Sequence, residues 1–330
     1  MSRVIVFKNK PSIISTYTVC GPKEAKGNLS GYIDLKVYDD YDNQRSFELA
    51  ERKMLACAIE RAVKKSKLKS DVIEAYIGGD LLNQIISSSF AAREFVFPFL
   101  GVYNACATMA ESMIVGAVLC DGGYLDNVVC ATSSHFSTAE RQYRFPLEQG
   151  TTRPAQSQWT VTGAGANVIS GSEVGKVKIL SAVLGRVVDY GVSDANNMGA
   201  AMAPAAADTL IDFFNYSTAS PSDYDLIITG DLGALGSRIL KDLLLKKGID
   251  IDSNHIDCGE LIYNVDEEEY QGGSGAGCSA VVFNSYIYKK MLKGEYRRVL
   301  LMTTGALLST TSTQQGDTIP GIAHLIELSV

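Results

Sequence analysis

The chain has 330 residues, 46% of them hydrophobic and 20% charged, and a formal net charge of −7. This length and composition predict a globular protein of about two domains with a large core. The negative net charge argues against a nucleic-acid-binding protein, which would carry a clustered basic footprint, so we expect no nucleic-acid partner. The one lysine-rich run, at 64–69, is interpreted as the solvated end of a helix.

The N-terminus, MSRVIVFKNK, lacks the apolar segment of a secretory signal, and no apolar run is long enough to cross a bilayer. We therefore expect a soluble chain that reaches a membrane only through partners. Seven cysteines at irregular spacing favour reduced thiols over a disulfide framework, and the three histidines lie far apart. The sequence thus predicts no metal site and no cofactor.

The first half of the chain reads as alternating helices and strands. Helical spacing predicts a helix over 45–62, and a short apolar strand within 71–80 follows it and ends in Gly-Asp. The turn Asn104–Ala107 then opens a second helix at Cys106, and that helix leads to a buried strand near 128–132. This order is typical of a sheet covered by helices on both faces.

The second half repeats that order. A helix is predicted over 198–214, and a strand within 223–231 again ends in Gly-Asp. A small-residue turn at 272–277 precedes Cys278, which lies as far before its strand as Cys106 does before its own. Residues 246–271 have no counterpart in the first half and are interpreted as an insertion. We infer a tandem duplication with halves 1–172 and 173–330, which meet near 170–175.

A strand, a turn with cysteine at a helix N-terminus, a helix and a strand, repeated twice, resemble the organisation of the thiolase superfamily. Within it, nearly the whole chain resembles the stage V sporulation AD family of spore-forming bacteria. The strings that carry this resemblance are GDLLNQ (79–84), ATSSHFSTAERQYRFP (131–146), MAPAAADT (202–209), GGSGAGCSA (272–280) and TTGALLS (303–309). The resemblance implies an α/β, thiolase-like fold with a duplicated, layered α-β-α-β-α architecture.

The resemblance also implies a function. Members of that family are associated with uptake of dipicolinic acid (pyridine-2,6-dicarboxylic acid) into the developing spore, together with other stage V sporulation A operon proteins at the spore inner membrane. The chain is expected to be peripheral there and to form a homodimer through the sheet near Val128–Thr132. Whether the ligand is the free acid or its calcium chelate stays open.

Cys106 matches the superfamily nucleophile in position. At a helix N-terminus its thiol pKa is expected below the usual ~8.5, although a buried small residue explains the same pattern. The partners of such a nucleophile are missing, because Gly230 and Asp231 stand where the synthases commonly have a histidine. Ser274 is the nearest polar candidate where a second histidine or asparagine is expected. We therefore expect a ligand pocket and not an enzyme.

Backbone N–H groups at the turn beginning with Asn104 are a candidate anion site. The loop that follows the 128–132 strand adds donors suited to carboxylates, because a guanidinium binds a carboxylate bidentately. The candidate ligand-binding residues are Cys106, His135, Arg141, Arg144, Arg153, Ser274 and Asn104. The alternative for the arginines is ion pairing with Glu140 and Glu148.

Other polar and aromatic residues have weaker assignments. The candidate walls of the pocket are Tyr103, Phe136 and Tyr143, with Asn83 and Gln84 as further lining residues. His255, in the extra segment, and His324 are interpreted as loop or core histidines, and Asp80 and Asp231 as residues that fix turns. Three hypotheses follow: a binding protein for the diacid, an active acyl-transfer enzyme using Cys106, and a scaffold with a vestigial pocket.

Overall fold

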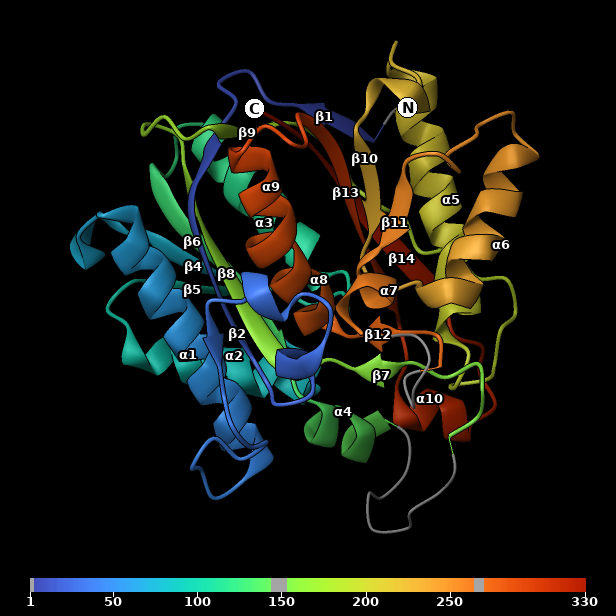
Figure 1. Ribbon diagram of the computed structural model, residues 1–330, viewed down its shortest axis with the longest axis horizontal. Helices are drawn as coiled ribbons and strands as arrows, with labels where there is room; N and C mark the ends of the chain where they lie inside the picture. Colours follow the sequence, from blue (N-terminus) through green and yellow to red (C-terminus); the bar gives the residue numbers. More distant parts are fainter. Residues whose placement is uncertain (1–2, 144–152, 264–269) are drawn as a thin grey trace.

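The computed structural model describes residues 3–143, 153–263 and 270–330, and shows two similar halves packed side by side (Figure 1). The first half is built from β2 (Ser12–Cys20), α1 (Phe47–Ser66), β4 (Ala75–Gly79), α2 (Ile86–Ala91), β5 (Phe99–Gly101), α3 (Thr108–Asp121), β6 (Asn127–Ser134), α4 (Phe136–Tyr143) and β8 (Gly163–Ser170). The second half is built from β9 (Val177–Val183), α5 (Met198–Tyr216), β10 (Leu226–Thr229), α6 (Gly233–Leu245), β11 (His255–Asp257), α7 (Cys258–Ile262), α8 (Ala276–Val282), the π-helix η8 (Phe283–Ile287), α9 (Tyr288–Leu292), β13 (Arg298–Ala306), α10 (Thr310–Gln314) and β14 (Gly321–Ser329).

Shorter elements complete the chain. The short strands are β1 (Val4–Val6), β3 (Leu35–Lys36), β7 (Trp159–Thr160) and β12 (Gly273–Ser274). The 3-10 turns are η1 (Glu24–Lys26), η2 (Ser30–Tyr32), η3 (Ser70–Val72), η4 (Asn83–Ile85), η5 (Ala92–Glu94) and η7 (Pro221–Asp223). Strands β7 and β12 pair in parallel, so they tie the segment after α4 to the turn before α8.

The strand order shows the duplication directly. The first half-sheet runs β5-β4-β6-β8-β2 and the second runs β11-β10-β13-β14-β9, so corresponding strands occupy corresponding places. In both halves the inner neighbours β4–β6 and β10–β13 are parallel, and β6–β8 and β13–β14 are antiparallel. The half-sheets meet where β2 pairs with β9 at Ser12 and Ile13. The thiolase-like, pseudo-symmetric α/β fold is thus confirmed.

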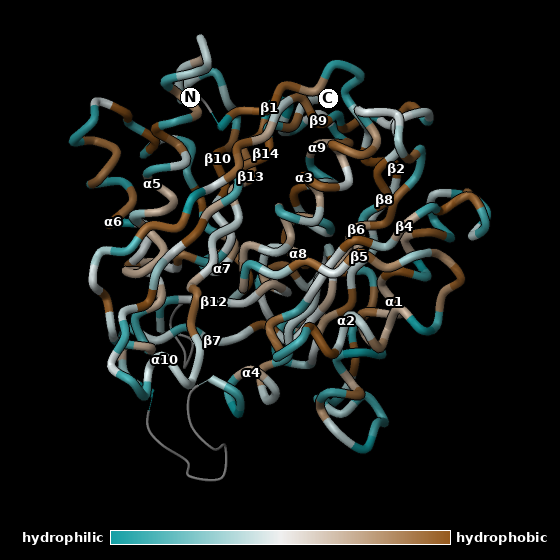
Figure 2. Tube along the Cα trace, turned by 180° about the vertical axis from the view of Figure 1, so that it is seen from behind, coloured by the Kyte–Doolittle hydropathy of each residue, from teal (hydrophilic) through white to brown (hydrophobic). Residues whose placement is uncertain are grey.

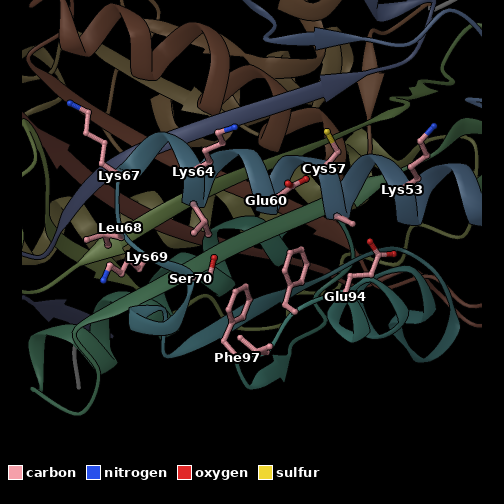
Figure 3. Close-up of a pocket in the computed structure, with 14 residues that line it drawn as sticks. Lys53, Cys57, Glu60, Lys64, Lys67, Leu68, Lys69, Ser70, Glu94 and Phe97 are labelled. Carbon is pink, nitrogen blue, oxygen red and sulfur yellow. The ribbon is translucent and has the colours of Figure 1, made fainter.

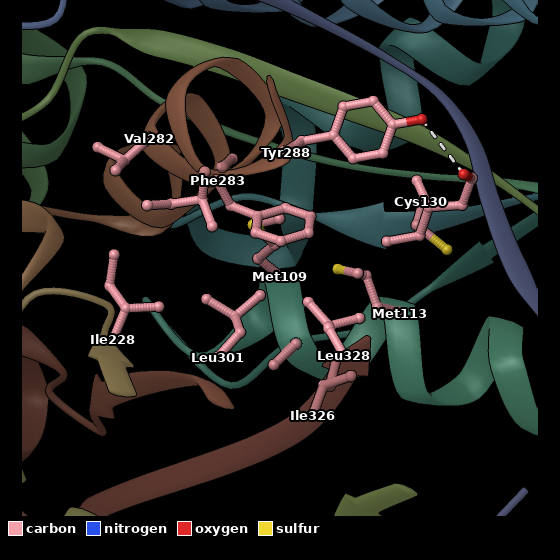
Figure 4. Close-up of a cluster of buried hydrophobic side chains, with 14 of the residues drawn as sticks. Met109, Met113, Cys130, Ile228, Val282, Phe283, Tyr288, Leu301, Ile326 and Leu328 are labelled. Atoms are coloured by element: carbon pink, nitrogen blue, oxygen red, sulfur yellow. Dashed lines mark hydrogen bonds between the residues drawn. The ribbon is translucent and has the colours of Figure 1, made fainter. Parts of the chain in front are cut away.

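The layers follow from three apolar cores. Helices α1 and α2 cover the outer face of the first half-sheet, α5 and α6 cover that of the second, and α3, α8 and α9 lie between the sheets (Figure 1). In the central core, Met109 and Met113 of α3 meet Phe283 and Leu301, all at most 2% exposed (Figure 4). The hydrophobic strands run through the interior of the molecule (Figure 2). Burial of this apolar surface is the main force that holds the two halves together.

Helix starts agree with local capping chemistry. The Ser46 side chain accepts a hydrogen bond from the Leu49 N–H at the start of α1, and the Asn197 side chain accepts one from the Ala200 N–H at the start of α5. These caps satisfy amide groups that lack a partner within the helix. The apolar residues Leu55, Ile59 and Ala62 then line the buried face of α1.

Two expectations about the sheet were wrong. The dimer seam was expected at Val128–Thr132, but these residues lie in β6, which is buried throughout and paired on both sides. A strand with both edges paired cannot add a strand from a second molecule. The segment 246–271 is also not wholly an insertion, because β11 within it is the edge strand that corresponds to β5. The predicted boundary at 172 lies between the end of β8 and the start of β9.

Among the described residues, no helix has the length and apolar character needed to cross a membrane.

Candidate functional site

A small pocket lies at the carboxyl ends of the parallel strands, where segments of both halves meet. Its volume is about 40 Å³, and it is lined by Leu81, Tyr103, Ala105, Cys106, Ala139, Glu140, Tyr143, Thr160, Met198, Ser274, Ala306 and Leu308. Ligand sites of open α/β sheets lie at this end of the strands. Cys106, 6% exposed, belongs to the apolar group that forms the pocket wall.

The turn that carries Cys106 is held in a strained conformation. Ala105 has a φ of 52°, a left-handed value that is rare for a residue with a side chain. Gly305 of β13 packs against this turn so closely that a Cβ there would lie 2.3 Å from the Asn104 carbonyl oxygen. The Thr303 hydroxyl donates to the Ala107 carbonyl at 2.9 Å. The second half therefore fixes the cysteine turn of the first half.

The chain itself uses some of the amide groups that were expected to form an anion site at this turn. The Asn104 N–H donates to the Thr108 hydroxyl at 3.0 Å, and the Ala107 N–H donates to the Asn104 carbonyl. The Ala110 N–H donates to the Thr303 hydroxyl at 3.2 Å. The Asn104 side chain points to His324, with 3.2 Å between Asn104 Nδ2 and His324 Nε2.

Asp231 is the ionisable neighbour of the thiol. Its carboxyl interacts with Cys106 through a hydrogen bond and through charge. It also accepts hydrogen bonds from the Ser274 hydroxyl at 3.2 Å, the Gly275 N–H at 2.9 Å and the Thr304 hydroxyl at 2.8 Å. Asp231 is 1% exposed, and burial raises the pKa of its carboxyl.

The expected lowering of the Cys106 pKa was wrong. Burial raises the pKa of this thiol well above its ordinary value, and the nearby Asp231 carboxyl raises it further. The helix N-terminus favours a thiolate, but desolvation and a like charge oppose it more strongly. The Cys106 thiol is consequently protonated at neutral pH.

A larger hollow adjoins the pocket on its outer side. It has a volume of about 520 Å³ and shares Tyr103, Tyr143 and Leu308 with the inner pocket. The Tyr103 and Tyr143 hydroxyls lie 3.2 Å apart, and the Tyr143 hydroxyl donates to the Leu81 carbonyl. The polar residues of the hollow are Asn83, Gln84, Gln142, Ser309, Thr310 and Thr311. The two tyrosines therefore stand between the inner pocket and the hollow.

The predicted arginines do not line the described pocket. Arg141 is exposed and pairs with Glu48 of α1. Arg153 Nη1 lies 3.0 Å from Glu140 Oε2, and the guanidinium lies 5.2 Å from the centre of the Trp159 ring. Arg153 thus contacts the pocket only through Glu140, which is the ion-pair alternative. Arg144 lies outside the described residues, as does Glu148.

The histidines have structural positions. His135, expected near the ligand, is fully buried, with its Nε2 2.8 Å from the Asp40 carbonyl oxygen and its Nδ1 accepting from the Ser137 N–H. Both ring nitrogens are therefore occupied away from the pocket. His255 Nε2 lies 3.0 Å from the Thr229 hydroxyl, and burial lowers the pKa of His255 to about 4. His324 accepts from the Gly185 N–H through Nδ1.

Most of the remaining predicted residues line one of the two cavities, and Phe136 and Asp80 line neither. Cys106, Ser274, Tyr103 and Tyr143 line the inner pocket, whereas Phe136 stacks on Trp159 with 3.9 Å between ring centres. Asn83 and Gln84 line the outer hollow. Asp80 fixes its turn by accepting from the Leu82 and Ser88 N–H groups.

Sequence reasoning missed several lining residues. They are Leu81, Ala139, Glu140, Thr160, Met198, Ala306 and Leu308. Asp231 was interpreted only as a turn residue, although its place after β10, where a histidine is expected in the synthases, was a signal that it faces the cysteine. The others come from loops and strand ends that carry no motif.

The inner pocket has few ionisable side chains in its described lining. No described lining residue of the inner pocket is a histidine, lysine or arginine. Besides Cys106 and the tyrosines, two ionisable side chains lie at this site, and both are acidic. Asp231 lies behind the thiol, and Glu140 lies beside Arg153.

The fold and the cysteine turn define a thiolase-fold protein. Among solved structures, the chain is similar to cerulenin-bound OleA of Xanthomonas campestris, with a TM-score of 0.64, 13% identity and coverage of 99% of this chain and 98% of that one. It is also similar to 3-oxoacyl-[acyl-carrier-protein] synthase III of Aquifex aeolicus, with a TM-score of 0.58, 12% identity and coverage of 97% and 100%. At these identities the likeness concerns the fold alone.

The family follows from the sequence. Residues 1–329 match the model of the family described as Stage V sporulation protein AD (SpoVAD). The stage V sporulation protein AD of Bacillus subtilis (strain 168) is 46% identical over 320 residues, which cover 97% of this chain and 94% of that protein. The chain belongs to the stage V sporulation protein AD family, and the resemblance inferred from its motifs is confirmed.

Proposed function

We propose that the chain is a non-catalytic binding protein for dipicolinic acid and supports uptake of this compound into the developing spore. Family membership supports the role in sporulation. One observation at the site carries the non-catalytic part: the Cys106 thiol faces the Asp231 carboxyl and not an imidazole. A thiol kept protonated in this way lines a pocket but does not attack a carbonyl at neutral pH.

The ligand needs more room than the inner pocket offers. About 40 Å³ holds roughly three water molecules, less than a pyridine ring with two carboxyl groups. We place the ring at the Tyr103–Tyr143 pair, with its carboxylates toward the hydroxyl and amide groups of the outer hollow. This orientation keeps the dianion away from Asp231 and Glu140, because like charges repel. A calcium chelate carries less charge and tolerates the acidic side of the pocket better.

Calorimetry with pyridine-2,6-dicarboxylate, with and without calcium, tests this proposal. Saturable binding is expected, and Leu308→Trp should weaken it at least tenfold because Leu308 lines both cavities. Arg141→Ala is the control, since Arg141 pairs with Glu48 outside both cavities, and its affinity should be unchanged. Absence of saturable binding at millimolar ligand contradicts the proposal.

A second candidate, acyl transfer through Cys106, is favoured by the left-handed Ala105, which presents the cysteine at the start of α3 as strained turns present nucleophiles. Incubation with acetyl-CoA followed by intact-mass measurement separates the two. An acyl adduct that Cys106→Ser removes, together with turnover, supports the enzyme. A chain that binds the diacid and is never acylated supports the binding protein.

At the spore inner membrane, we propose that the chain acts as a peripheral homodimer with other stage V sporulation A operon proteins. The edge strand β5 is the place for the second copy, since among the described strands it pairs with β4 alone. Co-purification of epitope-tagged chain with those proteins from detergent-treated spore membranes tests the association. Recovery of the chain without them contradicts it.

A further inference from the structure

A second concave surface lies along α1, on the outer layer of the first half. It is a groove of about 970 Å³ between α1 and the segment 94–97, and it shares no lining residue with the pocket or the outer hollow. Its apolar lining is formed by Ala56, Val63, Leu68, Phe95, Val96 and Phe97. Val96 is 87% exposed, so an apolar side chain is left in solvent beside the groove.

Lysines line both ends of this groove. Figure 3 shows Lys64, Lys67 and Lys69 toward one end and Lys53 toward the other. Lys53 Nζ lies 3.0 Å from Asp42 Oδ2. The other three lysines of the groove, Lys64, Lys67 and Lys69, have no ion-pair partner among the described residues. A chain with a net charge of −7 therefore gathers three lysines without a described ion pair at one end of the groove, while Glu60 and Glu94 also line it.

Helix-end electrostatics explain only part of this cluster. Basic residues in the last turn of a helix stabilise it through the macrodipole, which accounts for Lys64. Lys67 is different, because it is the C-cap of α1 with a φ of 66°, the left-handed conformation that favours glycine. A lysine at this position carries backbone strain that glycine avoids, so the C-cap conformation does not itself favour lysine here.

We propose that this groove binds a segment of a partner protein that combines apolar side chains with Asp or Glu residues. The apolar lining fits the apolar side chains, and the three lysines fit the carboxylates. From Lys53 to Lys67 helix α1 spans about 20 Å, the length of a short helix. A concave surface fits such a segment better than it fits a flat bilayer, and the apolar lining has no role in binding a free phosphate.

The probe is a fluorescein-labelled 14-residue helical peptide with leucines along one face and glutamates on both sides of them. Anisotropy with the full chain should show saturable binding, about tenfold weaker in Lys64→Ser/Lys67→Gly/Lys69→Ser, as three exposed ion pairs would give. The matched control, Lys176→Ser/Lys246→Ser/Lys247→Ser, removes the same charge elsewhere and should bind like wild type. Equal weakening by both triple variants, or equal binding of a peptide with lysine in place of glutamate, overturns the proposal.

Cross-linking identifies the occupant in sporulating cells. A photo-reactive benzoylphenylalanine in place of Val96 should cross-link to a peptide rich in Asp or Glu and apolar residues, and Lys64→Ser/Lys67→Gly/Lys69→Ser should abolish the product. Cross-linking to a second copy of this chain overturns the proposal in favour of a self-interface. Binding of phosphatidylserine vesicles through the same lysines, without binding of the peptide, overturns it in favour of a bilayer.

Discussion

The carboxyl of Asp231, from the second half of the chain, lies against the thiol of Cys106, from the first half. Both groups are buried, and burial raises the pKa of each. The Asp231 carboxyl disfavours the thiolate form of Cys106, whereas the hydrogen bond with the thiol favours the ionised form of Asp231. The thiol therefore retains its proton where a catalytic thiol would be ionised. The contact with Asp231 therefore lowers the reactivity expected of the Cys106 thiol in the pocket.

Asp231→Asn should make Cys106 more reactive. The substitution removes the carboxyl charge that opposes the thiolate, while burial remains, so the pKa of the thiol falls but stays high. A fall of one pKa unit corresponds to about a tenfold faster alkylation at pH 8. The rate is measured by mass spectrometry of the Cys106 peptide after treatment with iodoacetamide.

Two controls make that measurement specific. Cys57 is the one cysteine of the seven that is not buried, so the comparison uses a Cys57→Ser background. Asp317→Asn removes an exposed charge and should leave the rate unchanged. An Asp231→Asn chain that reacts no faster than its parent contradicts the charge relationship.

Buried acids should make the fold less stable as pH rises. Glu51 is 1% exposed, and burial, with Asp80 nearby, raises its pKa to about 8. Because the folded pKa exceeds the unfolded one, the stabilisation is complete below about pH 4.5 and is lost as pH rises through about 8. Glu24 and Asp257, each with a pKa raised to about 7, act in the same direction.

Glu51→Gln tests that dependence. The amide cannot ionise, so the loss in free energy of unfolding between pH 5 and 8.5 should shrink by roughly a few kcal/mol. Urea unfolding at several pH values measures it. Glu60→Gln changes an exposed acid of the same helix and should follow wild type. Equal pH dependence in wild type and Glu51→Gln contradicts the assignment.

Sequence periodicity predicted the long elements and missed the short ones. The helices predicted over 45–62 and 198–214 are found as α1 and α5 with ends shifted by a few residues, because long amphipathic segments carry many periodic positions. Strands β5 and β11 are three residues long and lie at sheet edges, so they show no alternation to detect. The insertion predicted over 246–271 is therefore too long, because it includes β11.

The site was predictable where it followed the duplication and not where it depended on distant contacts. The positions of Cys106 and Ser274 in the pocket follow from the repeated turns. The pairing of Arg141 with Glu48, and the effect of Asp231 on the thiol, join segments far apart in sequence. Local reasoning from a helix N-terminus considered only the dipole, whereas burial decides the pKa.

Lys67→Gly should stabilise the chain. Glycine adopts the left-handed C-cap conformation of α1 without strain, and the free energy of unfolding should rise by about 0.5–1 kcal/mol. Lys65→Gly is the matched control, because glycine within the last helical turn should cost about 1 kcal/mol. Urea unfolding measures both. If both substitutions destabilise the chain equally, the strain at Lys67 is not present in solution.

The edge strand β5 should carry the homodimer contact. Leu100 in this strand is 45% exposed, and β4 is the only strand paired with β5 in the described part of the chain. Leu100→Glu places a charge where two edges would meet, which should weaken the dimer at least about 30-fold, since burying an unpaired charge costs 2 kcal/mol or more. Light scattering should give twice 35.5 kDa for wild type and about 35.5 kDa for the variant at micromolar concentration. Val187→Glu, at a position 55% exposed in the second half, should remain dimeric. A wild-type chain of 35.5 kDa, or a Leu100→Glu chain of twice that mass, rules out a dimer at this edge.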